Sequence, residues 1–431
     1  MSEVGKKRIV ILGAGFAGLK LARELKQSDN KIFLIDRHNY HQFQPLMYQV
    51  ATSRLEPSSI SFPLRKVFQH EKNVHVRLAT VEGIDTYSKM VYTNNFDIKY
   101  DKLIIAIGCT TNYFGNERLK EYAMPMKSVT ESMALRNRIL LTFEKALYTP
   151  EKDLKAMMNF VIVGGGPTGV ELAGAIAEMK KFILPKDYPD MDFSNLNIFL
   201  IEGTDATLIS MSENAQKFSR KYLEELGVIV KTNTLVSDYD GDVVTFQDGG
   251  KIETKNVVWA AGVKGNLLDG LKGDYLVRGN RLKVDRFNEI EGLEDVYAIG
   301  DIAYMETEKY PRGHPQLANV AINQAKNLAQ NIIKGNDNKD KWTPFEYIDK
   351  GSMATVGKKR AVVDLPNYKF QGWFAWITWM AVHFWLILSV KNKLVIFINW
   401  MMSYFNNDST LRIILRAKKS KTSDKSMTMK T

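Results

Sequence analysis

Two segments of the chain share one pattern of apolar and polar positions. Residues 8–26 and 159–178 each begin with a short apolar run, continue through the motif G-x-G-x-x-G, and end with apolar residues at three- and four-residue spacing. A short apolar run before such a turn indicates a buried strand, and the later spacing is typical of an amphipathic helix. The pattern therefore predicts two strand–turn–helix units, whose glycine motifs begin at Gly13 and Gly164.

Further strand-like runs follow each unit. Residues 31–36 end at Asp36 and residues 196–202 end at Glu202, so an acidic residue closes the second strand in both copies. Strands that alternate with helical segments favour parallel sheets of doubly wound type, so the expected fold class is α/β with two Rossmann-like domains. Other predicted strands are residues 102–108, 256–262 and 295–301, and alternation around an Asp-Gly-Gly sequence predicts a hairpin between residues 241 and 259.

The pattern changes abruptly at Gln371. Residues 372–390 are nineteen residues without a formal charge, and residues 394–405 form a second apolar run. Five of the seven tryptophans lie between residues 373 and 400. This change predicts a separate C-terminal module, followed by a polar tail that is expected to be flexible.

Composition narrows the class of protein. The 431 residues are 45% hydrophobic and 25% charged, which is typical of globular proteins of two or three domains and excludes a disordered or fibrous chain. Cys109 is the only cysteine, which excludes a disulfide framework, an iron–sulfur cluster and a redox-active cysteine pair. Since no His, Asp and Glu cluster has metal-ligand spacing either, no metal site is expected.

Charge is concentrated near the C-terminus. The formal net charge is +11, and residues 406–431 carry seven basic residues against two acidic ones. A basic tail favours an anionic partner, and on charge alone both nucleic acid and a membrane surface remain open. The N-terminus lacks the long apolar stretch and cleavage site of a secretory signal.

Each glycine motif matches a dinucleotide-binding turn. Gly13 allows the tight turn, Gly15 lets the backbone approach a pyrophosphate, and Gly18 permits close packing of helix on strand, while the helix N-terminus offers free N–H groups to phosphate. Asp36 is placed to accept hydrogen bonds from a ribose. In the second copy, Gly164, Gly166, Gly169 and Glu202 have the same roles.

Two dinucleotide sites in one chain indicate hydride transfer between a tightly held redox cofactor and an exchangeable nicotinamide. Residues 203–205, which follow Glu202, include no arginine that would bind a 2′-phosphate. The second site is therefore predicted to prefer NADH over NADPH.

Several motifs together resemble a known family. The two glycine motifs combined with residues 260–262 and 297–301 resemble the flavoproteins with two dinucleotide domains. More specifically, the sequence from about residue 8 to about residue 405 resembles the type II NADH:quinone oxidoreductases. The segments that carry this resemblance are residues 36–57, 108–115, 164–174, 314–324 and 347–357 and the aromatic C-terminal run.

The resemblance implies cofactors, substrates and site residues. It implies non-covalent FAD, NADH as the electron donor, a membrane quinone as the acceptor, and no proton pumping. Glu171, Lys350 and Gln316 are the implied catalytic residues, with Glu171 close to where the nicotinamide meets the flavin. The implied FAD residues are Gly13, Gly15, Gly18, Asp36, Thr110, Asp301, Gln316, Leu317 and Ala318. NADH is assigned to Gly164, Gly166, Gly169, Glu202, Ala261 and Gly262, and the quinone tunnel to Gln316, Asn319, Asn323, Lys350 and Met353.

The chain departs from the family pattern at a few of these positions. Asn319 and Asn323 stand where glutamines are usual, so each keeps an amide but has a shorter reach by one methylene. Pro167 stands where an aromatic residue is frequent. A structural role is the alternative to a functional one for three of the residues. For Glu171 the alternative is an acid favoured by the helix dipole in the first helical turn. For Lys350 it is a surface lysine, and for Cys109 an inert buried thiol.

Three interpretations compete for the C-terminal module. A run of nineteen uncharged residues just reaches the roughly twenty needed to span a bilayer. Its tryptophans favour the headgroup interface instead, and residues 409–419 have the pattern of an amphipathic surface helix. A monotopic amphipathic helical anchor is therefore preferred over a transmembrane helix and over a soluble dimer interface, and the expected location is the cytoplasmic face of the bacterial inner membrane.

The predicted organisation has four parts. Residues 1–155 form the first part of the FAD domain, residues 156–285 the NADH domain, residues 286–345 the return segment of the FAD domain, and residues 346–431 the quinone-site and membrane-anchoring region with its flexible basic tail. Expected partners are NADH, membrane quinone and the lipid surface, with no nucleic acid, and a homodimer is left open.

Three rival functions are considered. A sulfide:quinone oxidoreductase would need a cysteine pair, and a soluble ferredoxin reductase is disfavoured by the aromatic run. A non-catalytic NAD(H)-sensing membrane adaptor differs from an enzyme in that bound flavin would not bleach when NADH is added.

Overall fold

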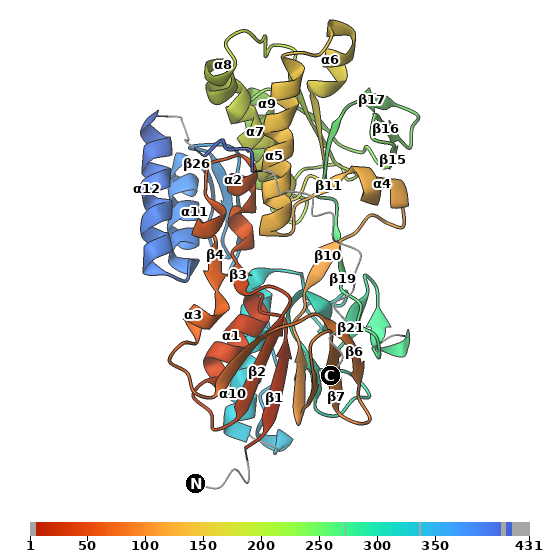
Figure 1. Cartoon of the computed structure of the whole chain (residues 1–431), viewed down its shortest axis with the longest axis vertical. Coiled ribbons are helices and arrows are strands. Elements are labelled where there is room, and N and C mark those ends of the chain that lie inside the picture. Colours follow the sequence, from red (N-terminus) through yellow and green to blue (C-terminus); the bar gives the residue numbers. More distant parts are fainter. Residues whose placement is uncertain (1–5, 272, 336–337, 407–410, 416–431) are drawn as a thin grey trace.

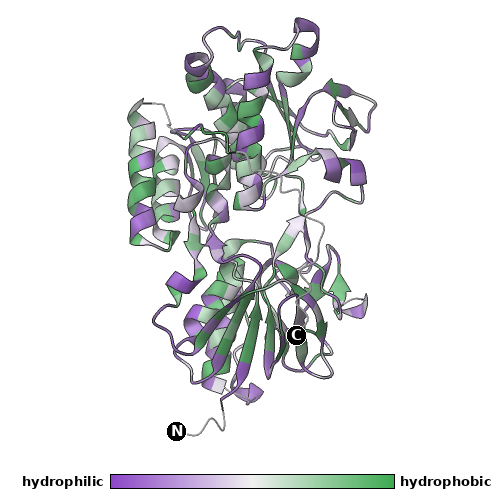
Figure 2. Cartoon of the chain, in the orientation of Figure 1, coloured by the Kyte–Doolittle hydropathy of each residue, from purple (hydrophilic) through white to green (hydrophobic). Residues whose placement is uncertain are grey.

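The molecule has two lobes, stacked along its longest axis (Figure 1). The computed structural model describes residues 6–271, 273–335, 338–406 and 411–415. Each lobe is built around a five-stranded sheet. Apolar residues dominate the central strands of both sheets, whereas the two C-terminal helices at the left edge mix apolar and polar residues (Figure 2).

The first sheet has the strand order β22-β9-β1-β2-β5, and all of its pairs are parallel. Successive residues of β1 enter different cores: Ile9 and Ile11 pack beneath helices α1 and α10, and Val10 and Leu12 pack on the opposite face. Side chains alternate along a strand, so a strand buried on both faces has the continuous apolar run seen here. The strands are β1 (Arg8–Leu12), β2 (Lys31–Asp36), β5 (Val74–Leu78), β9 (Lys102–Ile105) and β22 (Val296–Ala298), and the helices are α1 (Phe16–Leu25) and α10 (Ala318–Gly335).

The second sheet repeats this design in the order β11-β18-β12-β13-β14, again with parallel pairs. Phe160 and Ile162 face the core beneath helix α7, while Val161 and Val163 face the other side. The predicted α/β fold with two Rossmann-like domains is therefore confirmed. The strands are β11 (Met124–Pro125), β12 (Asn159–Val163), β13 (Asn197–Ile201), β14 (Val228–Lys231) and β18 (Asn256–Trp259), and the helices of this lobe are α4 (Glu117–Tyr122), α5 (Val129–Ala146), α6 (Glu151–Met157), α7 (Pro167–Glu178), α8 (Leu184–Asp187) and α9 (Glu213–Glu225).

The chain crosses between the lobes more than once. Strand β22 joins the first sheet after the chain has completed the second, and β10 (Cys109–Thr111) pairs with β19 (Val263–Gly265) between the lobes. Strand β11 lies within the range predicted as the first part of the FAD domain, yet it pairs with β18 of the second sheet. The exact domain boundaries stay a prediction.

Both lobes also contain minor strands and short helices. The predicted hairpin is present as β16 and β17, joined by a turn through Gly249. The minor strands are β3 (Tyr40–Gln42), β4 (Ser61–Pro63), β6 (Val81–Asp85), β7 (Met90–Thr93), β8 (Asp97–Lys99), β15 (Val236–Tyr239), β16 (Val243–Phe246), β17 (Lys251–Glu253), β20 (Leu276–Val277), β21 (Arg281–Lys283) and β23 (Ala303–Tyr304), and the short helices are α2 (Met47–Ala51) and α3 (Leu64–Val67).

The C-terminal module is a three-stranded antiparallel sheet with helix α11 packed on it and helix α12 packed against α11. Its elements are β24 (Ser352–Thr355), β25 (Ala361–Asp364), β26 (Lys369–Gly372), α11 (Trp373–Leu386) and α12 (Val390–Asn406). The nineteen uncharged residues therefore do not form one continuous helix. Helix α11 ends at Leu386, and Ile387 adopts an extended conformation with only 3% of its surface exposed. Across the described ranges, no helix is long and apolar enough to cross a membrane.

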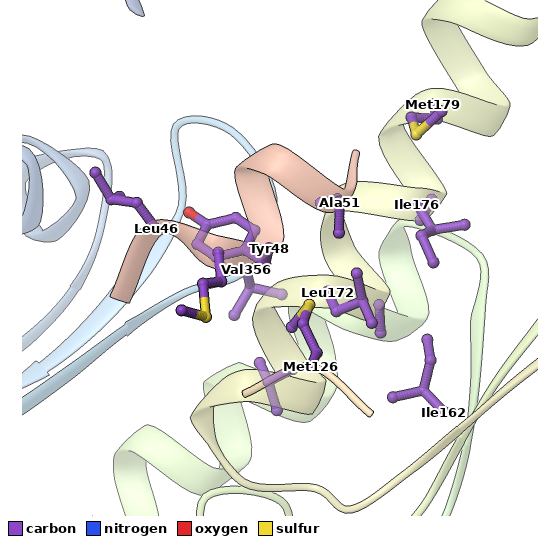
Figure 3. Close-up of a cluster of buried hydrophobic side chains, with 14 of the residues drawn as sticks. Leu46, Tyr48, Ala51, Met126, Ile162, Leu172, Ile176, Met179 and Val356 are labelled. Carbon is purple, nitrogen blue, oxygen red and sulfur yellow. The ribbon is translucent and has the colours of Figure 1, made fainter. Parts of the chain in front are cut away.

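One buried cluster joins this module to the second lobe. Figure 3 shows side chains from α2, α7 and the residue after β24 gathered in this cluster, among them Tyr48, Leu172 and Val356. Trp376 and Trp379 of α11 and Trp400 of α12 belong to the same cluster. The hairpin of α11 and α12 is therefore packed into the body on one side.

The expectation of an amphipathic helix over residues 409–419 is wrong where the structure describes that range. Residues 411–415 contain no helix and lie against the second lobe. Arg412 forms an ion pair with Asp187, and Asn137 of α5 donates a hydrogen bond of 2.7 Å to the carbonyl of Leu415. Tertiary contacts to α5 and α8 thus override the helical pattern. The tail predicted to be flexible, residues 416–431, lies outside the described residues.

Candidate functional site

The first glycine turn leaves the N-terminus of α1 open. Gly13 has a φ of +95°, and a Cβ there would lie 2.5 Å from the carbonyl oxygen of Ala106. At Gly15 a Cβ would meet no atom within 4 Å, and no side chain caps the helix that begins at Phe16. The free first-turn N–H groups and the open space above Gly15 fit the pyrophosphate of a dinucleotide.

Asp36 stands beside this turn at the end of β2. Its carboxylate accepts hydrogen bonds from the backbone N–H of Ala14 at 2.6 Å and of His38 at 2.7 Å. These bonds fix the carboxylate at the edge of the glycine turn, and each oxygen keeps a lone pair for a ribose hydroxyl.

The second glycine turn has the same geometry. Gly164 has a φ of +113°, and a Cβ at Gly166 would meet nothing within 4 Å. Glu202 accepts hydrogen bonds from the N–H of Gly165 at 2.6 Å and of Thr204 at 2.7 Å, as Asp36 does in the first copy. Pro167 is the first residue of α7, where the missing N–H of proline costs no intrahelical bond. Gly169 packs against Gly164, and Ala261 and Gly262 follow β18 beside the turn.

The return segment brings a third feature to the first glycine turn. A Cβ at Gly300 would lie 3.1 Å from Cβ of Ala17 in α1 and 3.5 Å from Cβ of Ala321 in α10, so the Gly300–Asp301 pair sits where the two helices meet. Among the described residues, none donates a hydrogen bond to the carboxylate of Asp301, and burial raises its pKa. An acceptor without a protein donor at this place fits the hydroxyl groups of a flavin's ribityl chain, so the residues present fit FAD.

Gln316 and Cys109 lie next to Asp301. The Gln316 side-chain amide donates to the backbone oxygen of Asp301 at 3.0 Å and to the sulfur of Cys109 at 2.8 Å. Burial raises the pKa of the Cys109 thiol to about 12, so the thiol is protonated and unreactive at neutral pH. Thr110 is exposed on β10, and Leu317 and Ala318 lead into α10.

Glu171 lies in the second turn of α7, because the helix begins at Pro167; the expectation of a first-turn position is wrong. The side chain is buried, with 8% of the residue exposed, and the N–H of Thr355 lies 3.4 Å from its carboxylate. Burial raises the pKa of Glu171 to about 8. A buried acid that is protonated at neutral pH can hold and release a proton.

A buried hydrogen-bond chain that the sequence did not reveal leads away from Glu171. The hydroxyl of Tyr48 lies 3.0 Å from that of Thr355, and the Gln49 amide donates to Tyr48 at 2.9 Å. The indole N–H of Trp400 donates to Gln49 at 2.8 Å. Tyr48 and Gln49 fall within a segment that carries the family resemblance, but no periodicity or spacing distinguishes them from core residues.

The residues predicted for the quinone tunnel divide into two groups. Gln316 precedes α10, and Asn319 and Asn323 lie one turn apart on it, with the Asn323 amide donating to Asn319 at 3.1 Å. Met353 lies on β24 opposite Val363, and Lys350 is exposed before that strand. The structure thus joins the amides of Asn319 and Asn323, whereas the Gln316 amide bonds to Cys109 and Asp301. The assignment of all five residues to quinone stays a prediction.

Two histidines pack against other parts of the fold. His41 is 3% exposed and contacts the carbonyl of Ala14 at 2.9 Å through Nδ1, and His383 stacks on Trp379 at a ring distance of 4.0 Å. Within the described ranges, no group of three or more His, Cys, Asp and Glu side chains could hold a metal ion.

Comparisons with known proteins agree with this geometry. Residues 7–325 match the family described as pyridine nucleotide-disulphide oxidoreductase, and residues 350–407 match the NDH2 C-terminal domain. The chain is 34% identical over 420 residues to the type II NADH:quinone oxidoreductase Ndh of Mycobacterium tuberculosis, covering 93% of this chain and 89% of that one. A type II NADH:quinone oxidoreductase of Staphylococcus haemolyticus is 29% identical over 360 residues, covering 82% of this chain and 88% of that one.

Solved structures show the same fold. The structure of NDH2 from Plasmodium falciparum in complex with NADH has a TM-score of 0.88 at 22% identity, covering 95% of this chain and all of that one. The sulfide:quinone oxidoreductase of Aquifex aeolicus has a TM-score of 0.72 at 18% identity, covering 93% of this chain and 95% of that one. The fold is therefore shared across several activities.

Proposed function

This chain belongs to the type II NADH:quinone oxidoreductase family and is an NADH:quinone oxidoreductase, and we propose that it works with non-covalent FAD, at a membrane surface, without pumping protons. The observation that carries the proposal is the pair of equivalent glycine turns, each with an open helix N-terminus and a fixed carboxylate. The absence of pumping is what the family resemblance implies.

FAD is assigned to the first turn. Gly13, Gly15 and Gly18 let the backbone approach its pyrophosphate, Asp36 holds the adenosine ribose, and Asp301 holds the ribityl chain. The remaining contacts come from Thr110, Gln316, Leu317 and Ala318. Bound there, FAD would accept a hydride from NADH and deliver two electrons to quinone.

NADH is assigned to the second turn, through Gly164, Gly166, Gly169, Glu202, Ala261 and Gly262. The Glu202 carboxylate is held by two backbone N–H groups and would bind the ribose hydroxyls of NADH. The 2′-phosphate of NADPH would meet this negative charge at close range, which favours NADH.

Quinone is assigned to Gln316, Asn319, Asn323, Lys350 and Met353, with Glu171 as the nearby proton-holding group. The bond between Asn319 and Asn323 orients both amides, and each retains polar atoms for a quinone carbonyl. Gln316 connects this region to the FAD residues through its bond to Asp301.

Membrane attachment is assigned to the outer faces of α11 and α12. Trp385 is 80% exposed, Val390 is 84% exposed and Phe405 is 72% exposed, which is an unusual concentration of apolar surface. We place this surface in the lipid interface on the cytoplasmic side, where NADH is available, and leave a homodimer open.

The experiment that tests the proposal is flavin extraction followed by a paired assay. Heat-denatured protein should release FAD in about equimolar amount, and the native protein should reduce a soluble quinone analogue with NADH. Protein that carries no flavin when purified and gains no activity with added FAD would refute the proposed cofactor. A sulfide:quinone activity is disfavoured because the chain has a single cysteine.

A further inference from the structure

A small cavity lies between the C-terminal helix hairpin and α2. Its volume is about 30 Å³, and the residues that line it include Tyr48, Gln49, Lys358, Trp379 and Trp400. About 10–15 Å³ is enough for one water molecule when polar partners are present. Trp379 is 1% exposed, and its indole N–H has no acceptor among the described residues. The cavity therefore has both the room and the polar lining for a bound water.

From this cavity, two hydroxyl groups lead to Glu171. Tyr48 lines the cavity, and its hydroxyl lies 3.0 Å from that of Thr355. Thr355 in turn contacts the Glu171 carboxylate with both its N–H and its hydroxyl. Tyr48 is 6% exposed and Thr355 is 1% exposed, so both are shielded from bulk solvent. A hydroxyl group donates one hydrogen bond and accepts others, so a row of hydroxyls can pass a proton along.

On the other side of the cavity is Lys358. Its ammonium donates hydrogen bonds to the backbone oxygens of Ser403 and, at 2.8 Å, of Tyr404 in the last turn of α12. The residue is half-buried, whereas Tyr48 and Glu171 are buried, so Lys358 is the most solvent-accessible of the three. The charged groups that act on Lys358 are Lys359, Glu178 and Arg54.

We propose that the proton consumed in quinone reduction reaches Glu171 from Lys358 through a water in this cavity and the hydroxyls of Tyr48 and Thr355. The overall reaction, NADH + H⁺ + quinone → NAD⁺ + quinol, takes one proton from solvent. Glu171 releases its proton toward the reacting quinone. The Thr355 hydroxyl then donates a proton to Glu171 and receives one from Tyr48, and Tyr48 receives one from the cavity water. Lys358 protonates that water, and solvent reprotonates Lys358. No electron moves through this row. The inference rests on the proposed role of Glu171 in quinone reduction.

Two further observations support this route. Burial raises the pKa of Glu171 to about 8 and lowers that of Lys358 to about 8, so both groups can exchange a proton near neutral pH. Burial also raises the pKa of Tyr48, with the nearby Glu171 charge adding to the shift, so its hydroxyl keeps its proton.

The helix hairpin holds this route together. Trp400 of α12 donates to Gln49, and Gln49 donates to Tyr48, so docking of the hairpin orients the Tyr48 hydroxyl. The same hairpin provides the carbonyl groups that hold Lys358. Tyr48, Thr355 and Lys358 are therefore residues that position and relay a proton for Glu171.

The test uses full-length protein with bound flavin and separates hydride transfer from proton delivery. Tyr48→Phe and Lys358→Met interrupt the route, and each has a matched control: Tyr239→Phe removes another buried tyrosine hydroxyl, and Lys369→Met changes an exposed lysine on β26 of the same module that does not line the cavity. Thr355→Val and Thr355→Ser form a third pair that removes or keeps a hydroxyl, and this pair carries the test if Tyr48→Phe does not fold.

Two rates are measured for each variant. Flavin reduction by NADH under anaerobic stopped flow should match the wild type, because the hydride brings its own hydrogen. Quinone-dependent turnover should fall about tenfold or more in Tyr48→Phe, Lys358→Met and Thr355→Val, with a changed solvent isotope effect. Thr355→Ser should retain most of the wild-type turnover because it keeps a hydroxyl, and the two controls should have wild-type turnover.

The contrary result is clear. Wild-type turnover, pH profile and solvent isotope effect in both Tyr48→Phe and Thr355→Val would overturn the route, and the proton would then enter elsewhere. A wild-type protein that fails to reduce quinone with NADH would instead refute the proposed function, which is a different outcome.

Discussion

At the scale of single residues, a buried acid is the feature on which the chemistry depends most. Glu171 is protonated at neutral pH because burial raises its pKa to about 8, and it contacts the backbone of the C-terminal module through Thr355. Its position in the second turn of α7 removes the helix dipole as the main explanation for an acid there, since that effect falls off within the first turn.

Glu171→Gln keeps the shape of the side chain and a hydrogen bond to Thr355 but cannot carry a proton. We expect folded protein with bound flavin, and quinone turnover lowered on the order of tenfold to a hundredfold. Steady-state kinetics of the purified variant check this, with Glu213→Gln, an exposed acid in the first turn of α9, as control. Turnover equal to that of the wild type would show that Glu171 has only a structural role.

The same substitution should change how stability depends on pH. Glu171 has a pKa near 4.5 when exposed and about 8 in the folded protein, so between these values the unfolded chain releases a proton that the native protein keeps. The stability of the wild type should therefore fall as pH rises from about 4.5 to about 8, by up to a few kcal/mol from this group. Thermal unfolding of both proteins across this range should show Glu171→Gln gaining stability relative to the wild type, and a constant difference would contradict the assignment.

Glu202 is expected to determine the choice of nicotinamide. Its carboxylate is fixed by Gly165 and Thr204, so a 2′-phosphate would be repelled by a charge that cannot turn away. The kcat/KM for NADH should clearly exceed that for NADPH, and Glu202→Gln should reduce the ratio of the two values. Equal kcat/KM values in the wild type would remove Glu202 from this role.

At the scale of elements, the sequence pattern predicts the central strands, but it does not predict the break between the two C-terminal helices. The strand of residues 8–12 is buried on both faces, so its apolar run and the following glycines identify it without any tertiary information. The break after Leu386 depends instead on Ile387 entering the core and on Asn392 donating to the carbonyls of Ser58 and Ser59. Such contacts between distant segments leave no local pattern.

The exposed face of the helix hairpin should control membrane binding. Replacing both Trp385 and Phe405 with serine removes two large exposed side chains, each worth roughly 1.5–3 kcal/mol when fully buried. Co-sedimentation with anionic vesicles should weaken by about ten- to a hundredfold or more. Tyr87→Ser is the control, because Tyr87 is 98% exposed on the other lobe. Unchanged binding of the double variant would place the membrane contact elsewhere.

At the scale of the whole molecule, the sequence predicts the two dinucleotide sites but not the links between the lobes and the C-terminal module. Asp36 and Glu202 follow from strand and motif spacing, whereas Tyr48, Gln49 and Lys358 meet only because three distant segments pack around one cavity. Trp376, Trp379 and Trp400 also belong to the main core, so the module is part of the folded body as well as its membrane-facing surface.

The most direct test of electron transfer from NADH through flavin to quinone is an anaerobic titration of the purified protein, recorded by flavin absorbance. Addition of NADH should bleach the flavin, and subsequent addition of a quinone analogue should restore the oxidised spectrum with one quinone consumed per NADH. Binding of NADH without bleaching, or bleaching that quinone does not reverse, would contradict this electron transfer.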